Sequence, residues 1–476
     1  MKAQTLIFVA ELLLGTAAAT QQCLGECQQS ALAFAYQYGY PLYAYGLLAH
    51  GLPTGEANKV FVSPILLTAA STSVVRPNVD TLYALILYDL SKADLEFTVP
   101  DVDSDRFWVF PFYDLYGNNF ASICSIYGYK PGKYLLRPAQ DDVGVQTQDI
   151  ADGYLAYVNS PTPYGFSIVR ILVRDGSTDL EYVRELENNI TLASVKGTRG
   201  TNIPAFDLDL FASVIHNSSL SNAEQVLQLT AAFAPYNLPE VQSDQSWVNR
   251  TLEHAGIRGQ TFTQPKGTNL TAAATTANAS SNNFFLIAGM SINLGHNWTQ
   301  VAPQAIGDYG SYYNARQAIA MQAYAALTAD IAIYPSYGAE LGLGLTFPQG
   351  PKQAYLVTFS GKPVLEPTGF WSLTVYNADL YLVPNELNRY ALNDRSNLTY
   401  PDGCLVYGNA SSNGEFQILL QSSDVPPPKN WTNNWLPTPA GGGRFYDNLR
   451  FYGAAPAITN GSYVYPTVTL IDAITT

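Results

Sequence analysis

The chain contains 476 residues, of which 47% are hydrophobic and only 13% are charged, and its formal net charge is −14. This length and composition predict two or three folded domains of about 100 to 200 residues each and exclude a disordered chain. The acidic balance excludes nucleic acid as an expected partner, because phosphate binding depends on clustered Lys and Arg.

Residues 1–20 predict a secretory signal peptide. Lys2 precedes an apolar stretch, residues 6–14, which is interrupted by Glu11, and small residues follow up to Thr20. This order is typical of a signal that is cleaved after small residues. No later run of about 18 apolar residues exists, so we expect a secreted protein without a membrane span.

The N-terminal third combines one helix with several strands. Residues 29–50 are rich in Ala and Tyr and predict a helix that is interrupted at Pro41. From residue 60 to about residue 174, short apolar runs alternate with Pro, Gly, Asp and Asn, which predicts a mostly β domain. Its clearest strands are residues 107–110 and 166–173.

The middle of the chain is less regular. Residues 178–186 predict a helix, and short helical patterns alternate with polar loops from residue 191 to about residue 305. Residues 271–283 are nearly low in complexity and predict an exposed, glycosylated loop. Residues 311–330 predict the strongest helix of the chain, with Ser311 as its cap and a stop at Pro335.

Strand signals return in the C-terminal part, with turn signals between them. Several short strands at this spacing predict a sandwich or jelly roll. The strand-like runs are residues 355–359, 370–376, 403–407, 415–420 and 443–452. We therefore expect an α+β, mostly β protein with a mixed N-terminal domain (21–190), a variable glycosylated segment (191–305) and a jelly-roll-like C-terminal domain (306–476).

Asn-x-Ser/Thr acceptors recur along the last two-thirds of the chain and favour a eukaryotic secreted glycoprotein. The acceptors are Asn189, Asn217, Asn249, Asn269, Asn278, Asn297, Asn397, Asn409, Asn430 and Asn460. Four cysteines allow two disulfide bonds in three connectivities. The expected pairing is a local Cys23–Cys27 bridge and a Cys124–Cys404 bridge that joins the two halves.

A polar cluster interrupts an apolar, strand-like stretch at residues 76–83. If the stretch is extended, Asn78 and Asp80 share the face opposite Tyr83. A buried carboxylate at Asp80 requires partners, which Arg76, Asn78 or a backbone turn could provide. The cluster either locks a turn or lines a pocket, and in a pocket Asp80 would be a general base or polar anchor.

Two further constellations are candidates for a site. Asp114, Tyr116, Asn118 and Asn119 follow a strand and predict a polar rim. The other set is aromatic and amide-rich, could bind an uncharged ring or a carboxylate, and consists of Trp371, Tyr376, Asn385, Arg389, Asn434, Trp435 and Arg450.

Each of these constellations has a structural alternative. Asp114 would then cap a turn, and Trp371 and Trp435 would be core aromatics. Asn434 would belong to a turn, and Arg450 would pair with Asp447 at the surface.

Several known chemistries have no matching motif. The chain has no Gly-x-Ser-x-Gly elbow, no phosphate loop and no complete Gly-x-Gly-x-x-Gly fingerprint. The histidines are distant in sequence and lack the spacing of metal ligands: His50, His216, His254 and His296. We therefore expect no nucleotide cofactor and no metal.

Short motifs follow one another in both halves, at residues 36–42, 78–83, 106–108, 114–120, 370–376, 434–439 and 449–452. Their order resembles a two-domain family, domain of unknown function 1254 followed by domain of unknown function 1214. The resemblance implies a mixed α and β first domain and a jelly-roll-like second domain, without an established mechanism. Together with the signal peptide and the acceptors, it suggests a secreted eukaryotic, fungal member.

The leading hypothesis is a cofactor-independent secreted enzyme of the isomerase, cyclase, lyase or hydrolase type, in secondary metabolism. It would act on a small apolar or aromatic molecule by acid–base chemistry, with Asp80 and Asp114 as catalytic candidates. The alternative is a non-catalytic secreted protein that binds a carbohydrate or a hydrophobic ligand. Glycoside hydrolysis would require Asp80 and Asp114 to lie within about 5 to 10 Å.

Overall fold

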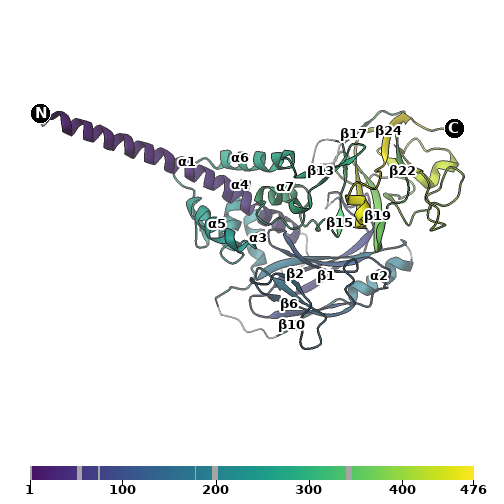
Figure 1. Ribbon diagram of the computed structural model, residues 1–476, viewed down its shortest axis with the longest axis horizontal. Helices are drawn as coiled ribbons and strands as arrows, with labels where there is room; N and C mark the ends of the chain where they lie inside the picture. Colours follow the sequence, from purple (N-terminus) through teal and green to yellow (C-terminus); the bar gives the residue numbers. More distant parts are fainter. Residues whose placement is uncertain (1–2, 51–55, 73–74, 177, 196–201, 339–345) are drawn as a thin grey trace.

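The computed structural model has three parts: a helical group around one long helix, a pair of sheets from the N-terminal half, and a C-terminal sandwich (Figure 1). It describes residues 3–50, 56–72, 75–176, 178–195, 202–338 and 346–476. In the long helix, side chains are described from Cys27 onward. The predicted signal peptide and Cys23 therefore have no described side chains.

The N-terminal domain contains two five-stranded sheets with an apolar core between them. The first sheet has the order β1 (Lys59–Ser63), β2 (Thr81–Asp89), β9 (Tyr164–Leu172), β4 (Trp108–Asp114) and β5 (Asn119–Cys124). The second has the order β10 (Thr191–Val195), β3 (Asp94–Val99), β6 (Gly132–Pro138), β8 (Tyr157–Ser160) and β7 (Gly144–Gln146). Because β10 pairs with β3, the first domain extends beyond the predicted boundary at residue 190.

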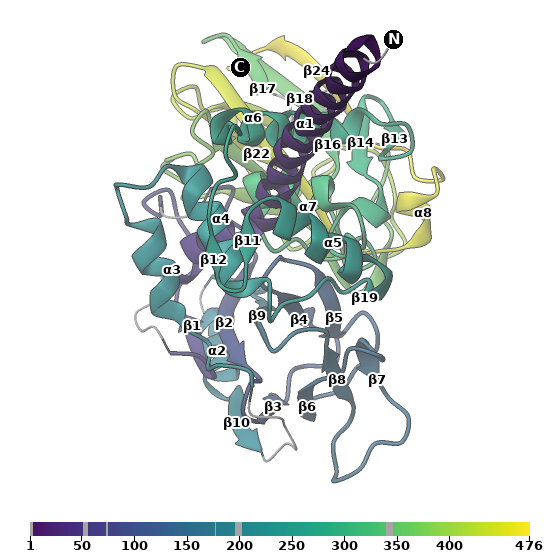
Figure 2. The same cartoon turned by 90° about the vertical axis from the view of Figure 1, so that its left-hand side faces the viewer.

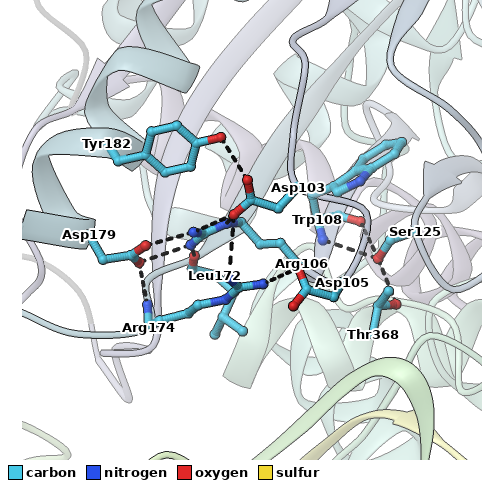
Figure 3. A network of polar contacts seen from close by, with 10 residues as sticks. All are labelled: Asp103, Asp105, Arg106, Trp108, Ser125, Leu172, Arg174, Asp179, Tyr182 and Thr368. Carbon is cyan, nitrogen blue, oxygen red and sulfur yellow. Dashed lines mark hydrogen bonds and ion pairs between the residues drawn. The ribbon is translucent and has the colours of Figure 1, made fainter.

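One polar network ties the helix α2 (Thr178–Asn188) to the strand ends of the first sheet (Figure 3). Arg106 is buried and donates from Nη1 to the carbonyl of Leu172 at 2.6 Å. Its Nη2 lies 2.6 Å from Asp179 at the start of α2 and 2.9 Å from Asp103. Every polar side-chain atom of Arg106, Asp103 and Asp179 has a hydrogen-bond partner. We therefore interpret the network as structural.

Helices gather around the long helix α1 (Ala3–His50), as Figure 2 shows. They are α3 (Leu208–Ile215), α4 (Asn222–Phe233), α5 (Gln242–His254), α6 (Leu270–Asn283) and α7 (Tyr313–Ala323). The predicted interruption at Pro41 is wrong, because α1 continues through it. Tyr38, Leu42 and Tyr45 are buried on both sides of Pro41, and this packing offsets the lost backbone hydrogen bond.

Two predictions for the middle segment are corrected. Residues 271–283 form the helix α6 and not a loop, because this stretch is rich in Ala and the side chain of Asn269 accepts from the backbone of Ala272. The helix predicted for residues 311–330 is shorter, and Ser311 does not cap it. The hydroxyl of Ser311 donates instead to Asp244 at 2.6 Å. Since α7 packs on α1, it belongs to the helical group.

The C-terminal part is built from two packed sheets. One contains β15 (Ala332–Ile333), β23 (Gly443–Ala454), β19 (Leu365–Asn377) and β20 (Ala391–Asn393), with β17 (Thr346–Gln349) also on β23. The other contains β22 (Trp435–Thr438), β21 (Phe416–Ser422), β18 (Gln353–Phe359) and β24 (Thr467–Asp472). The predicted strand at residues 403–407 is wrong, because only one isolated bridge, Thr399 to Leu405, forms there.

Smaller elements connect these parts. They are the hairpin of β11 (Ile257–Arg258) and β12 (Thr261–Phe262), the sheet of β13 (Ser291–Gly295), β14 (Trp298–Val301) and β16 (Ser336–Tyr337), the short helix α8 (Pro456–Thr459), and the 3-10 turns η1 (Phe284–Leu286), η2 (Pro303–Ala305) and η3 (Lys429–Asn434).

The strand β19 separates the sandwich core from the junction with the first domain. Trp371, Leu373 and Val375 point into the core between the two sheets. Side chains alternate along a strand, so Ser372, Thr374 and Tyr376 point to the other side. There, the hydroxyl of Tyr376 donates to the carbonyl of Pro77 in the first domain at 2.8 Å.

Cys27, Cys124 and Cys404 are unpaired, so the predicted Cys124–Cys404 disulfide bond is wrong. Cys124 is buried on β5, whereas Cys404 lies on an exposed turn. Within the described residues, no helix combines the length and hydropathy needed to cross a membrane.

Candidate functional site

Asp80 lies at the junction of the two domains, directly before β2. Its carboxylate is 2% exposed, and its Oδ1 accepts from Arg395 at 2.6 Å and from Asn393 at 3.1 Å. Both partners belong to the second domain, and none of the partners expected near Asp80 in sequence binds its carboxylate. Asn78 accepts from the backbone of Asp80 at 2.6 Å and thereby locks the turn. Asp80 Oδ2 is buried and has no hydrogen-bond partner among the described residues.

Arg450 connects the same junction from the side of the second domain. Its guanidinium is 3% exposed and donates to the hydroxyls of Tyr376 at 2.6 Å and Thr374 at 2.9 Å. It also donates to the carbonyl of Arg76 at 3.2 Å. The predicted surface pairing of Arg450 with Asp447 is therefore wrong. Asp447 is buried as well, and burial raises the pKa of its carboxyl to about 7.

The face of the first sheet that meets this junction is partly exposed at its centre. Tyr83 pairs in register with Arg170, and Leu85 pairs with Ile168 on the neighbouring strand. Tyr83, Leu85 and Ile168 keep intermediate exposure, although the residues around them in β2 and β9 are buried. Because these side chains share one face, they form an apolar and phenolic patch that borders Arg170. On this face, Leu85 and Ile168 also pack against the apolar core of the helical group.

Arg170 is the least satisfied charge at the junction. It is 8% exposed, its Nη1 has no partner within the described residues, and its Nη2 reaches the carbonyl of Ala325 only at 3.5 Å. The guanidinium lies 5.7 Å from the ring centre of Tyr83. It interacts electrostatically with four phenols, first that of Tyr113 and then those of Tyr83, Tyr334 and Tyr452. A buried guanidinium without a counter-charge is costly, so this geometry favours an anionic ligand.

Asp114 belongs to a different location. It aligns with Gly165 at the start of β9, whereas Asp80 aligns with Val173 beyond its end. Eight residues of strand separate them, or about 26 Å at 3.3 Å per residue. The two carboxylates therefore cannot act on one bond, and the geometry required for glycoside hydrolysis is absent.

The polar rim predicted around Asp114 is wrong, because its members are buried. Asp114 Oδ1 accepts from the backbones of Tyr116 and Asn118 at 2.9 Å, and Oδ2 accepts from the Asn118 amide at 2.7 Å. Burial raises the pKa of Asp114, whereas Arg316 and the hydrogen bonds from Asn118 and Tyr116 oppose this rise. This is the turn-capping alternative, and Asn119 likewise binds backbone carbonyls.

Arg316 on α7 is a buried charged residue that the sequence analysis did not identify as a candidate. It is 2% exposed and lies 4.4 to 4.8 Å from the ring centres of Tyr38, Tyr116 and Tyr313. Its Nη2 donates to the carbonyl of Tyr38 at 3.0 Å. Its Nε is buried without a hydrogen-bond partner among the described residues. The rings nevertheless surround this guanidinium, so we interpret it as structural.

The remaining members of the predicted aromatic and amide set do not converge on the junction. Trp371 lies in the sandwich core and donates to Tyr407 at 2.6 Å, and Trp435 donates to a backbone carbonyl of β21. Asn434 donates to the backbone carbonyls of Thr399 and Gln417, and Arg389 donates to that of Trp435. Asn385 binds the backbone of its own turn. These residues are structural, as the alternative reading predicted for the two tryptophans and Asn434.

His50 and His216 are distant in sequence but adjacent in the fold. His50 Nδ1 lies 3.1 Å from His216 Nε2 on an exposed surface. In the part of the chain that the structure describes, no three His, Cys, Asp or Glu side chains are grouped as metal ligands would be. The described residues of this region do not indicate a particular cofactor.

Comparisons with known proteins give the domain architecture. Residues 57–194 match the family model of a protein of unknown function (DUF1254), and residues 347–456 match that of a protein of unknown function (DUF1214). The search of curated proteins finds no match.

Two solved structures are similar. The VPA0106 protein from Vibrio parahaemolyticus is 18% identical with a TM-score of 0.62, over 94% of this chain and 100% of that one. A putative uncharacterized protein from Burkholderia cenocepacia is 11% identical with a TM-score of 0.43, over 97% and 98%. The first of these likenesses concerns the fold alone.

Proposed function

We propose that this protein, which carries a DUF1254 domain followed by a DUF1214 domain, binds a small organic anion between the two domains. The observation that carries the proposal is Arg170, a buried guanidinium whose Nη1 has no partner among the described residues. The carboxylate at the same junction, Asp80, already pairs with Arg395. A carboxylate or phenolate from a ligand would supply the missing charge through strong hydrogen bonds.

The patch beside Arg170 supports a ligand with an apolar or aromatic body. Leu85 and Ile168 are partly exposed next to Tyr83, and Phe61 faces Leu85 across the strand pair β1–β2. Apolar contact and a single charged anchor are the usual composition of a small-molecule site. The ligand class is therefore an aromatic or other apolar carboxylate.

We further propose that the protein transforms this ligand by acid–base chemistry without a nucleotide cofactor. The hydroxyls of Tyr83 and Tyr334 make no hydrogen bond to another described residue, and both phenols interact electrostatically with Arg170. A phenol beside a guanidinium can donate a proton to a ligand that the guanidinium holds. Asp80 remains a candidate base through Oδ2. These acid and base groups could catalyse an isomerisation, cyclisation, elimination or hydrolysis. We propose that the reaction belongs to secondary metabolism.

We also propose that the protein is secreted and glycosylated. Nine of the ten acceptor asparagines are exposed, and Asn278 is the exception, because it is half-buried and accepts from Gln317 at 2.8 Å. Exposure is what glycosylation requires, so it supports a secreted eukaryotic, fungal glycoprotein. The second candidate function is non-catalytic binding of the same ligand, with a jelly-roll-like second domain as scaffold.

Calorimetric titration with 2-naphthoate tests the binding step on the full chain. We expect Arg170→Met to weaken binding about tenfold to a hundredfold, because a hydrogen bond to a charged group contributes about 1.5 to 3 kcal/mol. Arg444→Met, on the exposed end of β23, is the matched control and should leave binding unchanged. Binding that Arg170→Met does not weaken would refute the proposal.

A comparison of metabolites between a deletion strain and its parent separates the two candidate functions. The acid that accumulates in the deletion strain is incubated with the purified protein. A converted product supports the enzyme, whereas recovery of unchanged acid after tight binding supports the non-catalytic alternative.

A further inference from the structure

A second pocket lies in the helical group, away from the domain junction. It has a volume of about 570 Å³, is partly open to solvent, and is lined by residues of α3, α4 and the β11–β12 hairpin and by Tyr164. Tyr164 is at the start of β9, six residues from Arg170, or about 20 Å along the strand. Apart from Tyr164, the lining residues lie between the two segments that match the family models.

The walls of this pocket combine apolar side chains with a smaller number of hydrogen-bonding groups. Leu210 and Phe233 face it from α3 and α4, and Phe262 faces it from the hairpin. Gln260 donates to the hydroxyl of Tyr236 at 2.6 Å. Because that hydroxyl accepts this bond, its own proton is available to a ligand, and the carbonyl of Gln260 can accept a hydrogen bond.

The described lining of the pocket provides no cation for an anionic ligand. Asp207 is its one charged residue among those described, and it lies exposed beside the start of α3. Its Oδ1 accepts from the backbone of Leu210 and caps the helix. No Lys or Arg is among the described residues that line the pocket. These residues therefore offer an anion no counter-charge, in contrast to the site at Arg170.

We propose that this pocket is a second ligand site, which takes a neutral, mostly apolar ring compound with one hydroxyl or carbonyl oxygen. Its volume is within the range of about 300 to 1,000 Å³ that is usual for small-molecule sites. The rings and aliphatic side chains contact the body of the ligand, and Tyr236 with Gln260 binds its oxygen. The two sites of the protein thus differ in the charge of the compound that they accept.

Fluorescence titration of the full chain with 2-naphthol and 2-naphthoate tests this assignment. We expect 2-naphthol to bind, and Ala232→Phe, which fills the pocket, to weaken it at least tenfold. Tyr236→Phe keeps the ring and should weaken 2-naphthol about threefold to tenfold. Ala279→Phe, on the exposed side of α6, is the control and should leave binding unchanged.

The two naphthyl probes separate this site from the junction. Ala232→Phe should leave 2-naphthoate binding unchanged, and Arg170→Met should leave 2-naphthol binding unchanged. The assignment is overturned if 2-naphthol does not bind, if neither Ala232→Phe nor Tyr236→Phe weakens it, or if Arg170→Met abolishes it. Thermal unfolding of each variant confirms that the comparison is made on folded protein.

Discussion

Arg170 and Arg316 are both buried, and neither makes an ion pair within the described residues, yet their surroundings differ. Three tyrosine rings lie within 4.8 Å of the Arg316 guanidinium. Arg170 has one ring, at 5.7 Å, and a partly exposed patch beside it. Each guanidinium has one buried nitrogen without a hydrogen-bond partner among the described residues, Arg316 Nε and Arg170 Nη1. The difference on which our proposal rests is that rings surround Arg316, whereas Arg170 borders side chains that keep some exposure. Burial of a charge alone therefore does not identify a binding site.

The largest expected effect is loss of stability on removal of Arg316. Arg316→Met leaves the carboxylates of Asp114 and Glu240 without the cation that interacts with both. We expect the free energy of unfolding to fall by about 3 to 5 kcal/mol. Denaturant unfolding measures this change.

Arg170→Met is the matched comparison for Arg316→Met. Replacement of an unpaired buried guanidinium by an apolar side chain is often neutral or stabilising, so we expect stability within about 1 kcal/mol of the wild type. An equal loss of stability in the two variants would show that Arg170 is also structural and would remove the distinction between them.

A smaller loss of stability is expected for Asp114→Asn. An amide cannot accept all three hydrogen bonds that Asp114 takes from Tyr116 and Asn118, so a buried donor loses its partner. We expect a decrease of about 1 to 3 kcal/mol in the free energy of unfolding. Asp80→Asn should cost less, since Asp80 Oδ2 has no partner to lose and Arg395 keeps some contact with solvent. If Asp80→Asn lost more stability than Asp114→Asn, Asp80 at the domain junction would be the more important structural carboxylate.

The pH dependence of stability reports on the neighbourhood of Arg316. Burial and then the carboxylates of Asp308 and Asp114 raise the pKa of Glu240 from 4.5 to about 8, against the opposing effect of Arg316. Between these values the folded state keeps a proton that the unfolded state has lost. Stability therefore falls as the pH rises from about 4.5 to 8.

Glu240→Gln removes this titrating group, and we expect it to flatten the fall in stability across the same pH range. Glu253→Gln, on the exposed end of α5, is the control and should keep the wild-type slope. Urea unfolding at a series of pH values gives both slopes. If Glu240→Gln keeps the wild-type slope, Glu240 is not the proton-binding group in this range.

Six of the seven strand-like runs named from local patterns coincide with strands, because alternation and turn residues are properties of neighbouring positions. The two-domain order came from the order of short motifs that resemble a known family. Local patterns failed for α6, where an Ala-rich stretch of low complexity was assigned to a loop although it has high helix propensity. They also failed at Pro41, since the packing that keeps α1 continuous comes from helices far along the chain.

The candidate site could be located only in part. The sequence singled out the segment around Asp80, and in the structure Tyr376 and Arg450, from another predicted set, contact this segment. Its partner Arg395 and the cation Arg170 were missed, because the contact with Arg395 joins positions more than 300 residues apart and Arg170 reads as part of an apolar strand. A charged residue inside an otherwise apolar strand is a sequence feature that could have identified Arg170 as a candidate.

Tyr83→Phe is expected to give the smallest change in stability and to affect mainly the binding of the anion. The hydroxyl of Tyr83 has no hydrogen-bond partner among the described residues, so Tyr83→Phe should change the free energy of unfolding by less than about 0.5 kcal/mol. It should nevertheless weaken 2-naphthoate binding about threefold to tenfold, since a hydrogen bond to a bound anion is lost.

Tyr116→Phe is the matched control for Tyr83→Phe in the neighbourhood of Arg316. The Tyr116 hydroxyl donates to the carbonyl of Asn237 at 3.0 Å in a buried setting, so its removal should cost about 1 kcal/mol of stability and leave 2-naphthoate binding unchanged. Calorimetric titration and urea unfolding of both variants measure the two effects separately. If Tyr83→Phe loses stability and keeps binding, the phenol beside Arg170 is structural, and the anion must be bound without it.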